Sequence, residues 1–216
     1  MAIVGTKLTH RVVGQGTFHC ERCGGDRPYW HRASRRWIQV LAVPVIPAGN
    51  AGEHLRCVIC ETCYRVELLA VPTMTQMLVA LRDGTLAAAL AMLAAAEPAS
   101  AAARRRAIET IKAAGLPEYG EAELAADLAG SRSAGAPADP GHPGASLRRI
   151  LSTLAIQLEG HAREWFLAGI VRIGLADGGL TTAQRQVIRQ IAHCFGMTQA
   201  QAQDVIWLTG EAAAAG

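Results

Sequence analysis

The sequence is poor in aromatic residues and lacks long apolar runs. Only 5% of its 216 residues are Phe, Trp or Tyr. The longest apolar stretches, 37–48 and 86–96, are shorter than the roughly 18 residues that a membrane-spanning helix needs. A basic start followed by an apolar segment and a small-residue cleavage site is also missing. We therefore expect no membrane insertion and a cytoplasmic protein.

An excess of charge of one sign is missing too, because the formal net charge is only +3. This value is too small to indicate a nucleic-acid-binding protein by itself. The motifs HExxH, GxSxG and GxGxxG and the P-loop are absent. Although His161 and Glu164 lie three residues apart, the paired ExxH spacing of metal-carboxylate bundles is not found. We expect that the protein is not an enzyme.

The composition changes near Pro72. Residues 1–72 contain five of the six cysteines, and the rest of the chain contains 35 of the 41 alanines. This contrast predicts two domains, a cysteine-rich one over 1–72 and an α-helical one over 73–210. The segment 130–146 is rich in Pro and Gly and has almost no bulky apolar side chains, so we predict a flexible loop there.

Two CxxC pairs stand in the first domain, Cys20 with Cys23 and Cys57 with Cys60. Each pair places two thiolates on one tight turn, and four thiolates complete a tetrahedral shell around one structural Zn²⁺. Cys63 extends the second pair to CxxCxxC and is an alternative to Cys57 as the fourth ligand.

Segments typical of strands surround the cysteines, at 11–18, 37–43 and 53–58. A small antiparallel sheet closed by zinc is a zinc ribbon. Disulfides are the alternative, and they require an oxidising compartment. A redox-active CxxC requires a βαβ context, which the sequence lacks.

Basic and aromatic residues alternate in one segment of the ribbon, at Arg32, Arg35, Arg36 and Trp37. Such residues bind phosphates and stack on bases. The other interpretation is a solvated strand whose tryptophans cover a small core, and we favour it because small ribbons depend on their aromatic residues.

Helices are predicted throughout the second domain, at 75–82, 86–96, 99–114, 121–128, 147–157, 159–176, 183–195 and 199–208. Capping boxes mark the last two helices, Thr181 with Gln184 and Thr198 with Gln201. Gly196 follows the first of these helices as a C-terminal glycine.

One stretch of the second domain resembles the tellurite-resistance TerB family. It runs Ala176-Asp-Gly-Gly-Leu-Thr-Thr-Ala-Gln184, then an Ile/Val stripe, then Phe195-Gly-Met-Thr198. The resemblance implies an all-α bundle with an internal pseudo-repeat, a link to stress and tellurite resistance, and divalent metal on acidic residues. The first domain is similar to zinc ribbons that precede such bundles in some bacterial proteins.

The acidic residues that match the family are few. Asp177 matches, and a weaker repeat of the Asp-Gly motif at 82–86 adds Asp83 as a second candidate. Gln184 stands where the family has glutamate, and Gly179 where an acidic residue is common. A second divalent metal site therefore rests on Asp177 and Asp83 alone, which is a poor ligand set for a hard cation.

These patterns together predict a small β zinc ribbon followed by an all-α, TerB-like helical bundle. The function that we expect is that of a non-catalytic zinc-binding protein associated with stress and tellurite resistance. It would act as an interaction adaptor for an unidentified protein partner or as a metal-responsive module. The alternative is a zinc-ribbon regulator that binds nucleic acid.

Overall fold

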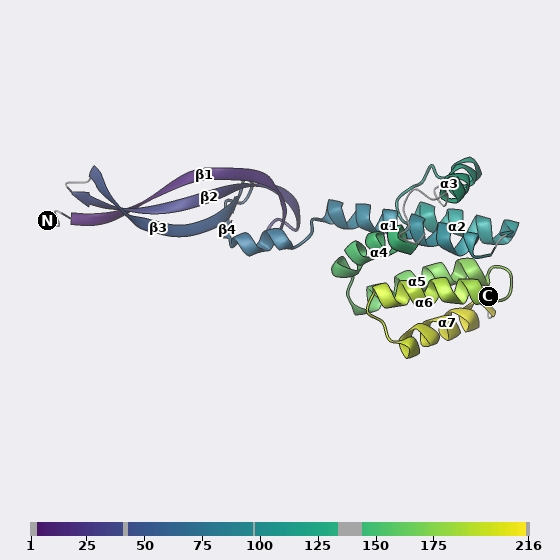
Figure 1. Ribbon diagram of the computed structural model, residues 1–216. Helices are drawn as coiled ribbons and strands as arrows, with labels where there is room; N and C mark the ends of the chain where they lie inside the picture. The colour runs from purple at the N-terminus through teal and green to yellow at the C-terminus, as the bar shows by residue number, and fades with distance from the viewer. Residues whose placement is uncertain (1–3, 41–42, 97, 134–143, 215–216) are drawn as a thin grey trace. The chain divides into compact units, whose positions relative to one another are not determined.

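The computed structural model describes residues 4–40, 43–96, 98–133 and 144–214. The chain divides into two compact units, Met1–Gln76 and Met77–Gly216, whereas the composition placed the boundary near Pro72. An antiparallel sheet fills the first unit and helices fill the second (Figure 1). Each unit is described by itself below.

The first unit is built on a sheet with strand order β1-β2-β3-β4 and antiparallel pairing throughout. The strands are β1 (Val4–Cys20), β2 (Gly25–Val40), β3 (Val43–Cys57) and β4 (Cys63–Tyr64), and a 3₁₀ helix, η1 (Val66–Ala70), follows. The first three strands have 15 to 17 residues, about three times the usual length. Successive side chains of each strand point to opposite faces.

The core of this unit is confined to its cysteine-bearing end. Its buried apolar side chains are Phe18, Cys20, Leu55 and Cys57. In the remote part of the same strands the apolar side chains are exposed, for example Leu8 at 51% and Ile46 at 54%. So small a core cannot offset the conformational entropy of about 70 residues, and the unit needs a further constraint near its cysteines.

The strand that the sequence predicts over 37–43 is split in the structure. Residues up to Val40 end β2, Val43 begins β3, and positions 41 and 42 lie outside the described residues. The segment carries no Asn-Gly or similar turn signal, so an apolar run could not distinguish one strand from a hairpin. The other two predicted strands fall within β1 and at the end of β3.

Seven helices follow in the described part of the chain. They are α1 (Met74–Ala94), α2 (Ala101–Ala113), α3 (Glu121–Ser133), α4 (Gly144–Gln157), α5 (Gly160–Leu175), α6 (Thr182–Cys194) and α7 (Gln199–Ala214). Helix α5 is central and packs against α2, α6 and α7. Leu167, Ile170 and Ile173 of α5 are fully buried in the shared apolar core, which all seven helices line. The expected all-α architecture of this part is confirmed.

The prediction of two separate helices over 75–82 and 86–96 is wrong, because one helix, α1, runs through Asp83 and Gly84. Gly84 is buried, and a Cβ there would lie 2.6 Å from Cδ2 of Leu154 on α4. The glycine therefore serves close packing of two helices, and not a turn. The resemblance of this segment to the loop at Asp177 does not extend to its conformation.

The prediction of a loop over 130–146 is wrong at both ends. Residues 130–133 belong to α3 and residues 144–146 to α4, and positions 134–143 lie outside the described residues.

One helical stretch of the described residues, Val66–Ala94, is long and apolar enough to cross a membrane by length and composition alone. The sequence analysis missed it because Arg82 and Asp83 interrupt its apolar run. Part of its most apolar window is buried, and Met92 and Leu93 near its end belong to the core of the second unit. Core helices of water-soluble bundles pass the same test.

Hydrogen bonds at the helix ends confirm the predicted capping residues. Thr181 and Gln184 form a reciprocal capping box at α6. Thr198 and Gln201 exchange the same two hydrogen bonds at α7, with distances of 2.8 and 3.2 Å. Gly196, after α6, has a positive φ of 67°, which suits a residue without a Cβ.

Arg163 on α5 donates hydrogen bonds to three main-chain carbonyls. Its guanidinium donates to the carbonyl oxygens of Ala155 at 3.0 Å, Leu158 at 2.6 Å and Phe195 at 2.8 Å. These carbonyls lie at the C-terminal ends of α4 and α6, where helices leave acceptors without partners. One planar cation thus satisfies the ends of two helices.

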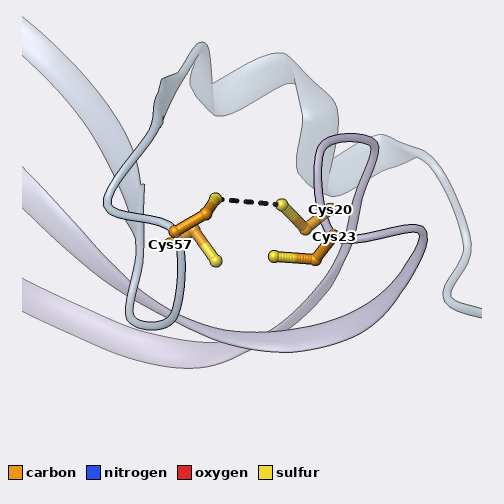
Figure 2. A group of neighbouring side chains, drawn as sticks. Cys20, Cys23 and Cys57 are labelled. Atoms are coloured by element: carbon orange, nitrogen blue, oxygen red, sulfur yellow. Dashed lines mark hydrogen bonds between the residues drawn. The ribbon is translucent and has the colours of Figure 1, made fainter.

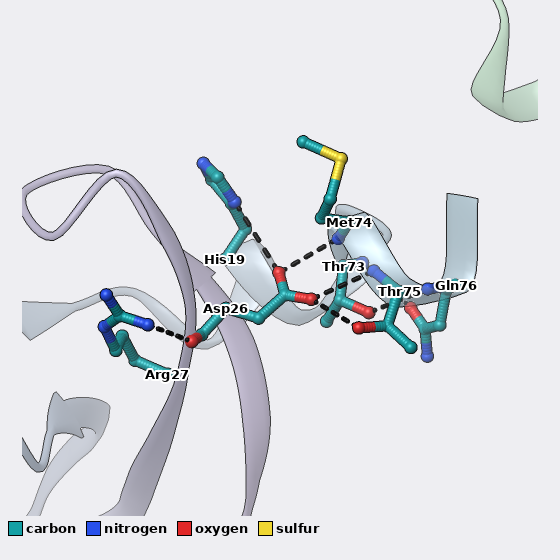
Figure 3. A network of polar contacts seen from close by, with 7 residues as sticks. All are labelled: His19, Asp26, Arg27, Thr73, Met74, Thr75 and Gln76. Atoms are coloured by element: carbon teal, nitrogen blue, oxygen red, sulfur yellow. Dashed lines mark hydrogen bonds and ion pairs between the residues drawn. The ribbon is translucent and has the colours of Figure 1, made fainter. Parts of the chain in front are cut away.

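Asp26, at the start of β2, caps the first turn of α1 (Figure 3). Its carboxylate accepts hydrogen bonds from the backbone N–H of Met74 at 2.9 Å and from that of Thr75 at 3.0 Å. Hydrogen bonds from Thr75 and Met74 lower the pKa of Asp26. Thr73 and Gln76 add a capping box at the same place.

We expect Arg163→Ala to lower the free energy of unfolding of the helical unit by about 2–4 kcal/mol, because three carbonyls lose a charged donor. Urea denaturation followed by helical circular dichroism measures the change. The matched control is Arg172→Ala, an exposed arginine on the same helix, which should shift stability by less than about 0.5 kcal/mol. Equal losses in the two variants would contradict this role of Arg163.

We expect Asp26→Ala to accelerate hydrogen exchange of the Met74 and Thr75 amides at pH 7, and Asp26→Asn to do so less because its amide oxygen still accepts. The pKa of Asp26 is lower in the folded chain, so its stabilising contribution is present above the unfolded pKa of about 3.9. That contribution disappears as the pH falls through the folded pKa. The difference between wild type and Asp26→Ala should therefore vanish in acid, and a difference that is independent of pH would contradict the capping role.

Candidate metal centre

Four cysteines from two turns of the sheet meet at one end of the first unit. Cys20 ends β1 and Cys23 lies in the turn before β2, while Cys57 ends β3 and Cys60 lies in the turn before β4. Figure 2 shows Cys20 and Cys23 on one turn, facing Cys57 on the other. The four sulfur atoms all lie within 4.8 Å of one another. In the part of the chain that the structure describes, no other group of His, Cys, Asp or Glu is placed to hold a metal ion.

The two turns have the same backbone geometry. The N–H of Gly24 donates to the carbonyl of Cys20 at 2.9 Å, and Gly24 has a φ of 65°. In the second turn the N–H of Glu61 donates to the carbonyl of Cys57 at 3.1 Å, and Glu61 has a φ of 59°. Glu61 thus stands where Gly24 stands in the first turn. A positive φ at a residue other than glycine is uncommon, so this turn is under local constraint.

This correspondence places Cys57, and not Cys63, with Cys60. Cys57 ends β3 as Cys20 ends β1, and its sulfur atom belongs to the group of four. Cys60 occupies in its turn the place that Cys23 occupies in the other, and both sulfur atoms belong to the group of four. Cys63 is exposed and begins β4. The structure therefore brings together Cys20, Cys23, Cys57 and Cys60, as the CxxC spacing indicates, and leaves Cys63 outside.

Hydrogen bonds and burial shift the pKa values of three of these thiols in different directions. Hydrogen bonds from the side chain and backbone of Thr62 lower the pKa of Cys60 to about 6. Burial opposes ionisation of Cys20, but hydrogen bonds, chiefly from the Tyr64 hydroxyl, outweigh it and lower the pKa of that thiol. Burial and the neighbouring sulfur atoms raise the pKa of Cys23 to about 12. Without a cation the group does not accept four negative charges, and a divalent metal ion supplies that compensation.

Tyr64 and Thr62 support the cysteines, and the sequence analysis did not find them. The Tyr64 hydroxyl lies 3.2 Å from Sγ of Cys20, and the Thr62 hydroxyl lies 3.4 Å from Sγ of Cys60. The ring of Tyr64 also packs edge-on against Phe18, with 5.4 Å between centroids. Both residues follow the second CxxC closely in the sequence, and this closeness was the signal that could have identified them as neighbours of the cysteines. Such neighbours orient ligands and tune a metal site.

The two acidic residues considered for a second metal site do not meet in the structure. Asp83 lies in the middle of α1 and pairs with Arg82 at 3.0 Å. Asp177 lies in the turn between α5 and α6, where its carboxylate accepts a hydrogen bond from the Ser100 hydroxyl. Neither belongs to a group of metal-ligating side chains among the described residues.

The basic segment of β2 is divided between the two faces of the sheet. Because side chains alternate along a strand, Arg32 and Arg36 share one face, and Arg35 and Trp37 share the other. The indole N–H of Trp37 donates to the Thr9 hydroxyl at 3.0 Å. The four residues therefore do not form the single surface that the nucleic-acid interpretation assumed.

Comparison with known protein families identifies the family to which the helical part of the chain is similar. The family model described as tellurite resistance protein TerB matches residues 83–205, more than half of the chain. No curated protein and no solved structure matches the chain. The matched residues run from the middle of α1 into α7, and thus cover most of the helical core. The chain belongs to the TerB family of tellurite resistance proteins.

Proposed function

We propose that this chain is a non-catalytic, zinc-binding TerB-family protein that serves stress and tellurite resistance as an interaction adaptor or a metal-responsive module. The observation that carries the proposal is the group of four cysteine sulfur atoms within 4.8 Å of one another. Four ligands at Zn–S distances of about 2.3 Å form a sulfur tetrahedron with edges of about 3.8 Å, which lies within this limit.

The donor set supports zinc. Four thiolates in a tetrahedral arrangement suit Zn²⁺ or an iron–sulfur centre, and hard cations prefer oxygen. Two tight CxxC turns that face each other are typical of structural zinc sites. A residue set of this kind in a reducing compartment keeps its thiols free for metal, which is why we place the protein in the cytoplasm.

The same donor set supports a structural and not a catalytic metal. Catalytic zinc keeps one position open for water or substrate, whereas four cysteines fill the shell. The metal would then replace the apolar core that the ribbon lacks, since the buried apolar side chains among its described residues are Phe18, Leu55 and two of the cysteines. Metal binding and folding of the ribbon are thereby coupled.

The adaptor role is supported by an apolar hollow of about 230 Å³ within the helical unit. The residues that line it include the apolar Leu81, Trp165, Phe166 and Ile170 and the charged Arg106 and Arg172. Trp165 is 66% exposed, although tryptophan is costly to leave in water and is enriched in binding hot spots. We assign this hollow to an apolar side chain of a protein partner.

Metal content tests the zinc site. Mass spectrometry of purified wild type should find one zinc per chain, because all four ligands are in place, and Asp177→Ala should retain it. Cys23→Ser should lose the zinc and unfold the ribbon, since the metal is its core, while the helical circular dichroism signal of the second unit remains. Cys63→Ser is the matched control and should keep the zinc.

Three results would contradict the zinc proposal. They are iron or no metal in the wild type, zinc lost from Cys63→Ser, and zinc kept with full occupancy in Cys23→Ser. A second metal that disappears in Asp177→Ala would contradict the assignment of all metal binding to the ribbon.

Partner capture tests the adaptor role. Wild-type protein, cross-linked in cells under metal stress, should recover a protein partner, and Trp165→Ala should recover at least about tenfold less because its anchor is removed. Trp207→Ala is the matched control, since Trp207 is also exposed, at 59%, but does not line the hollow. Equal recovery with both variants, or no partner with the wild type, would count against the assignment.

A further inference from the structure

A row of three polar side chains crosses one face of the ribbon sheet. The Ser34 hydroxyl on β2 lies 2.9 Å from Nδ1 of His10 on β1 and 3.4 Å from Nδ1 of His54 on β3. The two imidazole rings stand nearly perpendicular, with 5.4 Å between centroids. Ser34 is almost wholly buried beneath them. Three neighbouring strands thus hold a polar centre on an otherwise open sheet.

Three arginines surround this centre. Arg32 and Arg36 lie two residues before and after Ser34 on the same strand, hence on the same face and each about 7 Å away along the backbone. Arg56 lies two residues beyond His54 on β3. All three line a shallow depression of about 580 Å³ together with His10, Ser34 and His54.

The positive charge of this depression is only partly compensated. Glu61 is the one carboxylate that lines it, and Glu61 pairs with Arg56 at 2.6 Å. Among the residues that the structure describes, Arg32 and Arg36 have no ion-pair partner, and the buried Nε of Arg32 has no hydrogen-bond partner. With neutral histidines, three arginines and one glutamate leave a formal charge of +2.

The opposite face of the same strands is different. Glu53 on that face binds Nε2 of His31 at 2.7 Å, and Trp37 binds Thr9. Arg35 is exposed there, away from the depression. What distinguishes the first face is therefore the depression with its buried Ser34, and not positive charge alone, since Arg35 also has no ion-pair partner among the described residues.

We propose that the depression over Ser34 binds a phosphate-type oxyanion, a tetrahedral anion with a charge of about −2. The planar forks of Arg32 and Arg36 offer paired N–H donors from two sides, which matches the oxygens of such an anion. The exposed His10 ring offers a third donor. The local charge of +2 is the charge that one such anion neutralises. This inference is independent of which metal the cysteines hold.

The arrangement favours a single anionic group over a continuous chain of phosphates, because the arginines surround one polar centre and do not extend along the ribbon. The group has two possible sources, a free oxyanion and a phosphate of single-stranded nucleic acid. Both sources present the same kind of anionic group to the site, and a competition experiment between them distinguishes the two.

Protonation of His54 should strengthen binding. Burial first, and then the positive charges of His10, Arg32, His31 and Arg56, lower the pKa of His54. Glu61 and Arg36 also face the depression. A bound anion opposes this repulsion, so binding favours the protonated His54 and becomes tighter as the pH falls below the ordinary histidine pKa of about 6.5. Sulfate is the suitable probe because its own charge is constant over this range.

The experiment is a titration of the zinc-loaded full chain with sulfate, followed by NMR shifts of the His10 and Ser34 amides. We expect saturable binding that weakens at least tenfold in Arg32→Gln combined with Arg36→Gln, and that weakens in Ser34→Ala as a separate variant. Arg35→Gln removes one positive charge from the opposite face of the same strand and should bind like the wild type. Zinc content and amide dispersion show whether each variant is folded.

Competition identifies the source of the anion. A single-stranded oligonucleotide that displaces sulfate, with salt-dependent affinity, identifies a nucleic-acid phosphate. An oligonucleotide that leaves bound sulfate in place identifies a free oxyanion, and both results support the site. Absence of saturable sulfate and oligonucleotide binding by the folded wild type would overturn the proposal. So would equal losses in Arg35→Gln and in the Arg32 and Arg36 variant.

Discussion

The crowding of four thiols at one end of a long, thin sheet is the constraint on which the first unit depends. Outside that end almost no side chain of the strands is buried, so hydrophobic burial stabilises only Phe18, Leu55 and their few neighbours. The sulfur atoms lie in contact range of one another but oppose full ionisation, as the raised pKa of Cys23 shows. A divalent cation relieves that opposition, and a cation at this position would act as the core.

The sheet beyond the cysteines has little stabilising role, and this leaves its faces available for chemistry. Antiparallel pairing holds the register of Ser34 opposite His10 and of Arg32 opposite His54. Alternation along β2 then separates Arg32 and Arg36 from Arg35 and Trp37. A stretch of sequence that looks like one basic cluster is thus divided between two surfaces, one with the depression over Ser34 and the other with the His31–Glu53 pair.

The cysteine group could be predicted from the sequence because each CxxC pair is a local feature, and two such pairs specify four ligands. The choice between Cys57 and Cys63 as the fourth ligand could not, since it depends on a backbone turn in which Glu61 adopts a positive φ that glycine normally provides. Helix α1 was missed as one helix for a related reason. Gly84 looks like a helix break in sequence, but its role is set by Leu154, which is 70 residues away along the chain. The depression over Ser34 needed three strands in register, and no single segment contains that information.

Family membership and the richest chemistry lie in different parts of this chain. The TerB match covers residues 83–205, within which Asp83 and Asp177 each have a neighbouring partner of their own. The cysteine group and the basic depression both lie in Met1–Gln76, outside the match. A function transferred from the family therefore describes the bundle, whereas the function of the ribbon has to be argued from its own residues. The two sites of the ribbon are physically linked, because Arg56 immediately precedes Cys57 and pairs with Glu61, which follows Cys60. A metal ion that orders this turn also fixes one wall of the depression.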